Sequence, residues 1–313
     1  MDSKNYNLIA ILDNQYYLVS KIGCGSNSII YMGYDINDSS KSLMSFKIIK
    51  DLNCKYSNII NNEFNILSKL NNDYILKIKS QNKGIFYDVI NNKQEEIIYL
   101  IEEHISNYDL LDYIYLTKGF GEEFGKIIFY QILCAVEYIH NNNIYHRDIK
   151  VDNIMITNDF KIKLVDFGFS TNCSGYVTDF IGTPNYAAPE LHLKLPYLPK
   201  YNDIFSLGVN LFVIVNGQLP FKLPLIKDNL YKYFVFNDYL SFWMKKKHLN
   251  LSIEFMELFD NLCAFDPTQR PSIEEIKNSK WMKNIKWELY PRLIEEFKRR
   301  KFIIENNIKK NNL

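Results

Sequence analysis

The chain has 313 residues, a length that fits one large domain or two lobes. Lysine plus arginine number 37 and aspartate plus glutamate 36, and the formal charge of +1 argues against a nucleic-acid-binding surface over the whole protein. Hydrophobic residues make up 47% of the sequence, yet no apolar run approaches the roughly 20 residues of a membrane span. The first residues also lack the pattern of a signal peptide.

The cysteines are scattered along the chain and none forms a CxxC pair. They are Cys24, Cys54, Cys134, Cys173 and Cys263. An odd number without metal-ligand spacing predicts reduced thiols, not a disulfide framework or a zinc site. We therefore expect a location in the cytoplasm or the nucleus.

The order of predicted elements divides the chain into a β-rich part and a helical part. Strands are predicted over 16–22, 28–35 and 43–50, a helix over 57–70, and further strands over 74–80 and 95–103. After residue 105 the pattern is mainly helical, with long helices predicted over 121–143 and 203–215 and short strands over 153–157 and 161–167. The fold class is therefore α+β, with a small antiparallel N-terminal part.

The stretch GCGSNSIIYMGYD carries a GxGxxS pattern made by Gly23, Gly25 and Ser28, with Ile30 two residues later. Glycines between strands often mark an ordinary hairpin, because glycine adopts positive φ at no steric cost. A glycine-rich turn of this kind also cradles phosphates, although the third glycine of that pattern is replaced here by Ser28. The pattern alone does not decide between these two interpretations.

Two later motifs point to phosphoryl transfer. In YHRDIKVDN, Asp148 is placed to accept a hydroxyl proton, Lys150 to neutralise charge on a phosphoryl group, and Asn153 to hold magnesium. LVDFGFS adds Asp166, whose carboxylate oxygens suit the same hard cation. Chance is a poor explanation for the presence of both motifs at this separation.

Lys47 lies on a predicted strand, and Glu63 follows on the predicted helix. A fixed cation can hold a triphosphate, and a helical carboxylate can position that cation. Taken alone, the two side chains would be read as ordinary solvated charges.

Together with GTPNYAAPE and DPTQRP, these motifs resemble the eukaryotic protein kinase family from about Tyr16 to Met282. The resemblance implies a two-lobed kinase fold, with ATP between the lobes and Mg²⁺ as the metal cofactor. It divides the chain into an N-terminal extension, an N-lobe, a C-lobe and a C-terminal tail, at 1–15, 16–101, 106–290 and 291–313. The kinase domain as a whole covers 16–290.

The resemblance also assigns roles to single residues. Asp148 would be the catalytic base, with Lys150 beside it, and Asn153 and Asp166 would hold the metal. The ATP-binding positions would be Ile22, Gly23, Gly25, Ser28, Ile30, Lys47, Glu63, Glu103 and Ile105.

The form of the motifs resembles serine/threonine kinases, through Lys150 in HRDIK and Thr183 in GTP. PNYAAPE resembles the AMP-activated and calcium/calmodulin-dependent branch. Asp109 and Asp152 match positions where basophilic relatives bind an arginine of the substrate, which implies protein substrates with a mild preference for Arg or Lys. No nucleic-acid partner is expected.

Two alternatives stay open at this point. A pseudokinase, which binds nucleotide or partners without catalysis, usually lacks one of three key residues, and Lys47, Asp148 and Asp166 are all present. In the adenine pocket, an ungapped alignment places Glu102 at the position called the gatekeeper, whereas a slip of one residue would place Ile101 there.

The activation segment is predicted to need little phosphorylation. Arg147 precedes the catalytic aspartate, and relatives neutralise this arginine with a phosphothreonine at the position that Asp179 occupies here. Phosphorylation of the neighbouring Thr178 is the conventional alternative. From Asp166 to Glu190 the chain has no lysine or arginine, so a carboxylate at Asp179 matches the single charge of Arg147.

The tail RLIEEFKRRKFIIENNIKKNNL is predicted to form a basic amphipathic helix, with Leu293, Phe297, Ile304 and Ile308 on one side. Such a helix is most often docked on its own domain or frayed. A regulatory partner or autoinhibition through this tail is the alternative.

Overall fold

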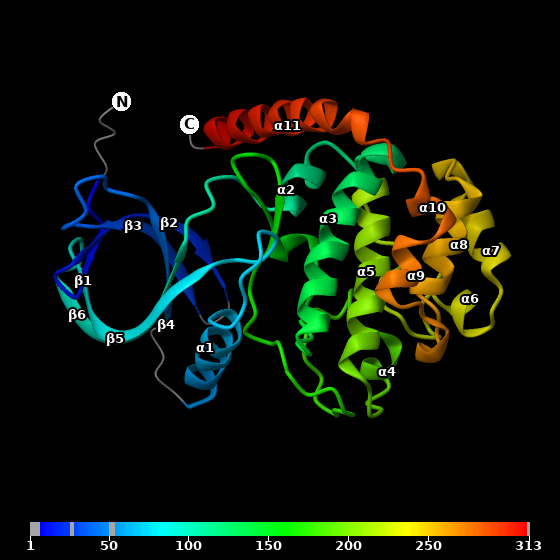
Figure 1. Cartoon of the computed structure of the whole chain (residues 1–313), viewed down its shortest axis with the longest axis horizontal. Helices are drawn as coiled ribbons and strands as arrows, with labels where there is room; N and C mark the ends of the chain where they lie inside the picture. Colours follow the sequence, from blue (N-terminus) through cyan, green and yellow to red (C-terminus); the bar gives the residue numbers. More distant parts are fainter. Residues whose placement is uncertain (1–6, 26–27, 50–53, 312–313) are drawn as a thin grey trace. The chain divides into compact units, whose positions relative to one another are not determined.

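The computed structural model describes residues 7–25, 28–49 and 54–311. It consists of two compact units, Met1–Ser106 and Asn107–Leu313. The first unit combines antiparallel strands with a helix, and the second is largely helical (Figure 1). The predicted α+β kinase fold is therefore confirmed.

The strands of the N-terminal unit close into an antiparallel barrel in the order β1-β2-β3-β4-β6-β5. Its elements are β1 (Ala10–Leu12), β2 (Tyr16–Cys24), β3 (Ile29–Asp35), β4 (Met44–Ile49), α1 (Cys54–Leu67), β5 (Ile78–Asp88) and β6 (Lys93–Glu103). β1 pairs with β2 on one side and with β5 on the other. The stretch that the sequence analysis set apart as an N-terminal extension thus supplies the strand that closes the barrel.

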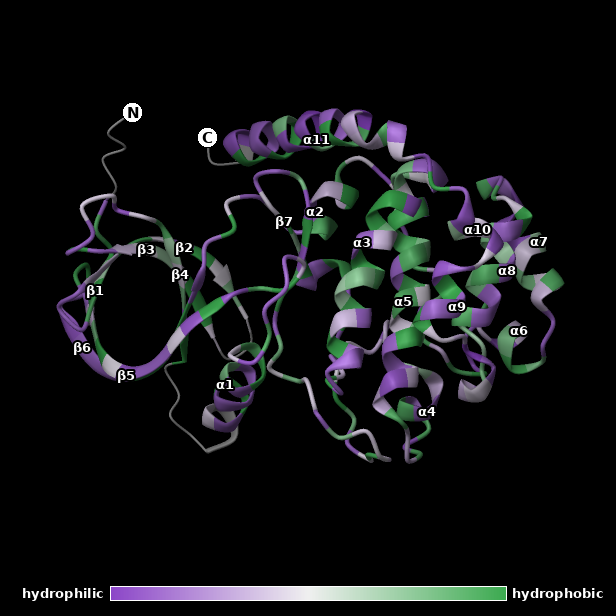
Figure 2. Ribbon diagram, viewed as in Figure 1, coloured by the Kyte–Doolittle hydropathy of each residue, from purple (hydrophilic) through white to green (hydrophobic). Residues whose placement is uncertain are grey.

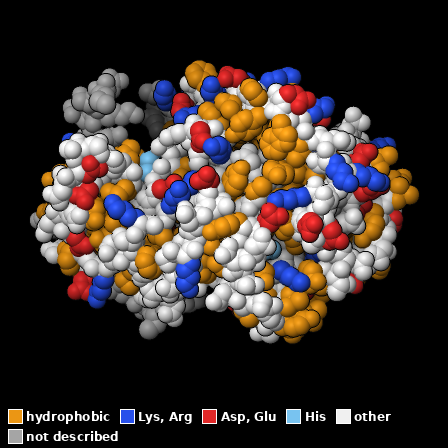
Figure 3. All heavy atoms as spheres, in the orientation of Figure 1, with side chains coloured by type: hydrophobic (Ala, Val, Ile, Leu, Met, Phe, Trp, Pro, Cys, Tyr) orange, Lys and Arg blue, Asp and Glu red, His pale blue; other side chains and the backbone are white. Residues whose placement is uncertain are grey.

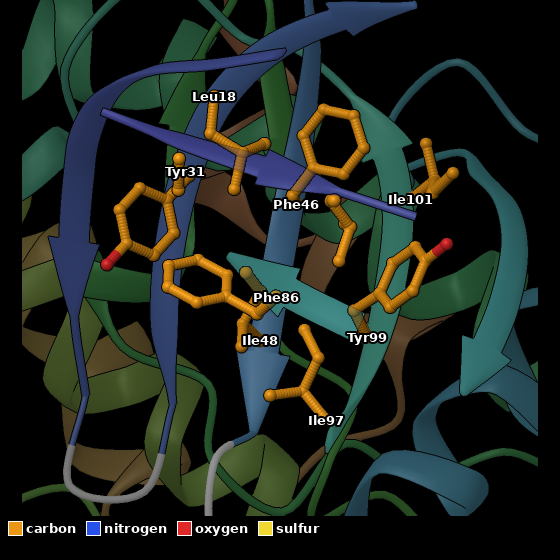
Figure 4. Packing of buried hydrophobic residues seen from close by; sticks show 10 residues of the cluster. Leu18, Tyr31, Phe46, Ile48, Phe86, Ile97, Tyr99 and Ile101 are labelled. Carbon is orange, nitrogen blue, oxygen red and sulfur yellow. The ribbon is translucent and has the colours of Figure 1, made fainter. Parts of the chain in front are cut away.

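The barrel is filled by alternate side chains of its strands, as the two-residue period of a strand requires. Figure 4 shows Leu18, Tyr31, Phe46, Ile48 and Phe86 pointing toward one another, together with Ile97, Tyr99 and Ile101. Phe46 and Ile48 flank Lys47 on β4, so the lysine side chain lies on the opposite face of the sheet.

The outer face of β4 and β6 carries a second apolar cluster, and α1 packs against it. Ile49 and Leu100 from the strands contact Ile60 of α1, with Phe64 and Ile98 partly buried beside them. This packing turns the face of α1 that carries Glu63 toward the sheet, and Glu63 is only 1% exposed.

The C-terminal unit begins with two helices and a short hairpin: α2 (Leu110–Tyr115), α3 (Gly121–Asn141), β7 (Ile154–Ile156) and β8 (Ile162–Leu164). Its later helices are α4 (Pro189–His192), α5 (Pro199–Asn216), α6 (Lys232–Val235), α7 (Tyr239–Lys246), α8 (Ile253–Leu262), α9 (Ile273–Lys277), α10 (Lys280–Lys283) and α11 (Tyr290–Asn311). Single 3-10 turns lie at Val151–Asn153, Lys247–Leu249, Pro267–Gln269 and Trp287–Leu289.

The long helices α3 and α5 lie side by side at the centre of this unit (Figure 1). α5 is hydrophobic over most of its length (Figure 2), and its residues from Asp203 to Val215 are all buried. A helix that is apolar nearly all round belongs in a core, which is how the sequence analysis interpreted this segment.

The terminal helix α11 docks on α2 and on the start of α3. Leu293, Phe297 and Ile304 are buried as predicted, whereas Ile308 is 44% exposed. The docking interpretation of the tail therefore agrees with the structure.

One basic residue of α11, Arg300, is buried. Arg300 is 4% exposed, and its guanidinium lies 3.6 Å from the ring centroid of Phe120. It donates to the carbonyl oxygens of Tyr113, Lys118 and Gly119 at 2.8–3.0 Å, and to Glu296 at 2.7 Å. These carbonyls belong to the end of α2 and the loop after it, so Arg300 supplies donors that an isolated helix end lacks.

The surface matches the balanced composition. On the face shown in Figure 3, side chains of both charges are interspersed, without a large area of one sign. In the part of the chain that the structure describes, no helix is both long and apolar enough to cross a bilayer.

We predict that Arg300→Ala lowers the free energy of unfolding by about 3–5 kcal/mol, because it leaves Glu296 and three carbonyl oxygens without their buried donor. Arg299→Ala is the matched control: Arg299 bonds to the same Glu296 but is 57% exposed. We expect the control to cost less than about 1 kcal/mol. Chemical denaturation of both variants measures the difference, and equal losses would contradict the role of Arg300.

Candidate functional site

Lys47 and Glu63 form an ion pair in the N-terminal unit. Lys47 Nζ lies 2.9 Å from Glu63 Oε1 and 2.7 Å from Oε2. The lysine side chain is 12% exposed and the glutamate side chain 1%. The pair that the sequence analysis singled out is thus formed in this unit, and the short helix-to-strand contact fixes the lysine ammonium.

The pairing of β4 with β6 distinguishes between Glu102 and Ile101. Ile101 lies opposite Phe46 and belongs to the barrel interior. Glu102 lies opposite Ser45 and is 6% exposed. Ser45 is two residues before Lys47 on the same strand. Because residues i and i+2 of a strand share a face, Glu102 lies on the same face of the sheet as Lys47. This agrees with the ungapped interpretation.

The glycine-rich turn joins β2 to β3. Gly23 pairs with Ile30, and the N–H of Gly25 donates to the carbonyl oxygen of Ser28 at 2.9 Å. A Cβ added to Gly25 would lie 3.3 Å from Ser28 Oγ, so the turn is tight there. Neither glycine has a φ in the left-handed region, and a Cβ added to Gly23 would make only ordinary contacts with Ile30 at 3.4–3.6 Å. Ile22 is 45% exposed beside this turn.

Glu103 and Ile105 lie at the end of β6 and just after it. The carboxylate of Glu103 accepts from the backbone N–H of Lys77 at 2.7 Å, and its own N–H donates to the Lys77 carbonyl at 3.0 Å. Among the described residues the backbone N–H of Ile105 has no hydrogen-bond partner. This exposes one backbone donor in the segment where adenine was expected to bind.

In the C-terminal unit, Asp203 of α5 supports the loop that carries Asp148. Asp203 is completely buried and accepts the backbone N–H groups of His146 and Arg147 at 2.9 and 2.8 Å. His140 Nε2, from α3, lies 2.9 Å from the same carboxylate. Arg147 has a φ of +66°, an unusual value for a non-glycine residue, and these hydrogen bonds stabilise it.

Asp148 is 4% exposed and lies at the centre of a polar cluster. Its Oδ1 accepts from the N–H and the Oγ1 of Thr183 at 2.8 and 2.7 Å. Lys150 Nζ lies 3.1 Å from Asp148 Oδ2 and donates to Thr183 Oγ1 at 2.8 Å. Asn153 Nδ2 donates to the backbone oxygen of Asp148 at 2.9 Å.

Gly182 lets the segment with Thr183 reach Asp148. Its φ is +116°, and a Cβ at this position would lie 2.5 Å from the carbonyl oxygen of Arg147. Any other residue would therefore push the activation segment away from the catalytic loop. This is the physical reason for glycine in the GTP motif.

Asn153 and Asp166 supply oxygen atoms of the kind that Mg²⁺ prefers. The amide Nδ2 of Asn153 donates to Asp148. The Oδ1 of the same side chain accepts no hydrogen bond from the described residues. Asp166 lies just after β8 with a φ of +63°. The donor chemistry of these two residues fits the predicted cation.

Arg147 and Asp179 form an ion pair. The Nη1 atom of Arg147 donates to Asp179 Oδ2 at 2.8 Å, and Nε donates to the carbonyl of Phe169 at 2.7 Å. Tyr197 holds the backbone of Asp179 through a 3.1 Å hydrogen bond from its hydroxyl. Thr178 is exposed.

Glu190 at the end of the same segment pairs with Arg270. The contact is bidentate, with Arg270 Nη1 2.7 Å from Glu190 Oε1 and Nη2 2.8 Å from Oε2. Both residues are buried, so this pair ties the end of the activation segment to the loop after α8.

Three carboxylates lie near one another where α2 begins. Asp109 caps α2 by accepting from the N–H of Asp112 at 2.9 Å, and Asp152 lies on the 3-10 turn that follows the catalytic loop. Desolvation, together with the charges of Asp112 and Asp152, raises the pKa of Asp109 to about 7. Desolvation and the charge of Asp152 also raise the pKa of Asp112, which the sequence analysis did not single out.

Polar residues of α5 that the sequence did not reveal hold the PNYAAPE segment and the loop after Asp148. Asn202 accepts from the N–H of Ala188 at 3.0 Å, and Asn210 donates to the carbonyl of Ile149 at 2.9 Å. With Ser206 they recur every four residues along α5, so they share one face. A polar stripe on an otherwise apolar helix was the signal that could have found them.

The comparisons agree with this geometry. The family model described as protein kinase domain matches residues 16–282. The probable serine/threonine-protein kinase MARK-B of Dictyostelium discoideum is 30% identical over 85% of this chain and 36% of its own length. The serine/threonine-protein kinase SIK2 of Gallus gallus is 31% identical over 78% of this chain and 29% of its own.

Testis-specific serine/threonine-protein kinase 1 of Homo sapiens is 31% identical over 87% of this chain and 73% of its own. The chain thus spans only about a third of the length of the first two relatives. With an SNF1-related kinase of Arabidopsis thaliana also among the relatives, the predicted resemblance to the AMP-activated and calcium/calmodulin-dependent branch is confirmed.

Proposed function

The chain belongs to the protein kinase family, and we propose that it transfers the γ-phosphoryl group of ATP to serine and threonine hydroxyls of protein substrates. The observation that carries the proposal is the buried carboxylate of Asp148, fixed by Thr183 and flanked by Lys150. Serine and threonine are favoured because Lys150 and Thr183 are in direct contact at 2.8 Å, each as it occurs in the serine/threonine class.

Each part of the proposed phosphoryl transfer involves particular residues of the chain. Asp148 accepts the proton of the substrate hydroxyl as the oxygen attacks phosphorus, and the ammonium of Lys150 offsets negative charge on the moving group. Lys47, held by Glu63, binds phosphate oxygens of ATP. Mg²⁺, held by Asn153 and Asp166, would neutralise charge on the phosphates when bound.

Adenine and phosphate binding follow from the N-terminal unit. The N–H of Ile105, which no described residue accepts, and the backbone of Glu103 suit the edge of adenine. Gly23, Gly25 and Ser28 suit the phosphates. Ile22 and Ile30 lie beside the same turn and offer apolar contact to the nucleotide.

Substrate choice is proposed to include a mild preference for Arg or Lys, through Asp109 and Asp152. The support is electrostatic: these carboxylates lie near a third one, Asp112, and a substrate guanidinium would relieve their mutual repulsion. Protein substrates are thus the proposed partners.

We propose that Asp179 is a partial substitute for a phosphate and gives substantial activity without an upstream kinase. The 2.8 Å pair between Arg147 and Asp179 already neutralises the arginine beside the catalytic base. A carboxylate in place of a phosphate gives an activation segment that is ordered as synthesised.

The cytoplasm or the nucleus is the proposed location, supported by the cysteines at 24, 134, 173 and 263, which are all free.

We predict that Asp148→Asn lowers transfer of labelled phosphate to a peptide library by about 10²–10⁴-fold, because the general base is lost. The control is Asp159→Asn, a carboxylate on the β7–β8 loop that is 61% exposed and pairs with Lys161. It should act like the wild type. Absence of transfer by the wild type, or equal transfer by Asp148→Asn, would favour the pseudokinase alternative.

We predict that phosphatase-treated wild type keeps most of its activity and that Asp179→Ala loses about tenfold or more, since Arg147 then lacks its charged partner. Thr178→Ala should stay within about twofold of the wild type. Loss of activity on phosphatase treatment or in Thr178→Ala, with Asp179→Ala unaffected, would show that phosphorylation controls the enzyme. Mass spectrometry of each sample establishes its phosphorylation state.

We predict that the preference for Arg over Ala in the substrate rises between pH 6 and pH 8. The pKa of Asp109 is raised to about 7, so the carboxyl is neutral below this pH and charged above it. The ratio of kcat/KM for the two peptides measures the effect, because kcat/KM reports ionisations of the free enzyme. Asp109→Asn should flatten the profile, and a profile unchanged in this variant would contradict the assignment.

A further inference from the structure

A hollow of about 450 Å³ lies between the loop that joins α5 to α6 and the start of the PNYAAPE segment. Its lining residues are Asn185, Leu219, Pro220, Phe221, Lys222, Lys227, Asp228, Asn229 and Leu230. All belong to the C-terminal unit. None of them has a role in the catalytic cluster described above.

The loop that forms the hollow is held in one shape by Asp228. Its Oδ2 accepts from the N–H groups of Lys222 and Leu223 at 3.0 and 3.3 Å, and its Oδ1 from those of Leu230 and Tyr231 at 2.8 and 2.9 Å. A carboxylate that accepts several backbone N–H groups fixes the turn around it. The hollow therefore exists before any ligand binds.

The floor of the hollow is apolar and rigid. Phe221 is 3% exposed, and its ring lies 4.8 Å from that of Tyr231, which is completely buried. Pro220 is buried beside it. Side chains in such packing do not move to fill the space.

The rim of the hollow is positively charged. Lys222 and Lys227 are exposed, and within the described ranges 7–25, 28–49 and 54–311 neither forms an ion pair with a carboxylate. The acidic group of the lining is Asp228, whose two oxygens already accept from four backbone N–H groups. Two exposed lysines thus line the hollow together with one carboxylate that is already hydrogen-bonded, so the lining carries an excess of positive charge.

The hollow lies close to the catalytic aspartate along the chain. Thr183 bonds to Asp148, and Asn185 of the lining is two residues later. Two Cα–Cα steps of about 3.8 Å place Asn185 within roughly 8 Å of Thr183. An extended substrate advances about 3.3 Å per residue, so this separation corresponds to about two to three residues, and a side chain at least that far from the phosphorylated one would reach the hollow.

We propose that this hollow binds an anionic side chain of the protein substrate, with Lys222 and Lys227 as the specificity-determining residues. The inference rests on the proposed kinase activity. The ligand chemistry is a carboxylate or a phosphate group, carried by Asp, Glu or a phosphorylated serine. Substrates of this enzyme therefore combine a cation, taken by the Asp109 and Asp152 carboxylates, with an anion at a second position.

The test begins with a peptide library in which Glu, phosphoserine, Gln or Lys is placed at each position within six residues of the target serine. We expect one position, at least two residues from the serine, at which an anion raises kcat/KM over Gln by about threefold to tenfold. Comparison of kcat/KM for Glu and for phosphoserine at that position shows which of the two anions is favoured. The preference should fall as salt rises from 50 to 500 mM, because the lysines are exposed.

The double variant Lys222→Glu, Lys227→Glu should reverse the order, so that Lys at that position exceeds Glu. The double variant Lys245→Glu, Lys247→Glu, at two exposed lysines outside the hollow, is the charge-matched control and should keep the wild-type preference. A wild type with no anion preference at any position, or a double variant that keeps the preference, overturns the inference. Both results would still leave kinase activity intact, whereas no phosphorylation of any peptide would overturn the proposed function itself.

Discussion

The buried carboxylate of Asp203 is the contact on which the catalytic part of the C-terminal unit depends. It accepts two consecutive backbone N–H groups, of His146 and Arg147, and so compensates for the left-handed φ of Arg147. That backbone geometry directs the Arg147 side chain toward Asp179 and the next residue, Asp148, toward Thr183. A buried charge without such partners would be very costly, which explains why His140 and two amides converge on one carboxylate.

The same loop is braced from its other side by the activation segment. Gly182 approaches the Arg147 backbone, Thr183 binds Asp148, and Asp179 binds the Arg147 side chain. One of these contacts is a close backbone approach and two are polar, and all three involve the consecutive residues Arg147 and Asp148, so they act together. The proposed substrate-binding features, Asp109 and the Lys222 hollow, lie outside this network. Substrate selection can therefore vary while the catalytic geometry is kept.

Much of the fold could be predicted from the sequence, and so could the contact between Lys47 and Glu63. Phosphoryl transfer restricts residue types at fixed spacings, so Lys47 and Glu63 could be named before their 2.7 Å contact was known. The partners of backbone groups could not be predicted in this way. Asn210 meets the carbonyl of Ile149 only because tertiary packing brings α5 against the catalytic loop. The burial of Arg300 could not be predicted either, because helical periodicity assigns a face to a residue but does not identify the carbonyl oxygens of another segment.

The closure of the barrel by β1 has a consequence for how the N-terminal unit forms. Asp13, directly after β1, accepts from the N–H of Ile85 and from the hydroxyl of Tyr99, across sequence separations of 72 and 86 residues. Gly84 leaves the space for this carboxylate. At roughly 5–20 residues per second, a ribosome needs several seconds to make the intervening chain. Until β5 and β6 have emerged, the nascent chain carries an open sheet edge that can pair with other strands, so chaperone protection matters most for this unit at that stage.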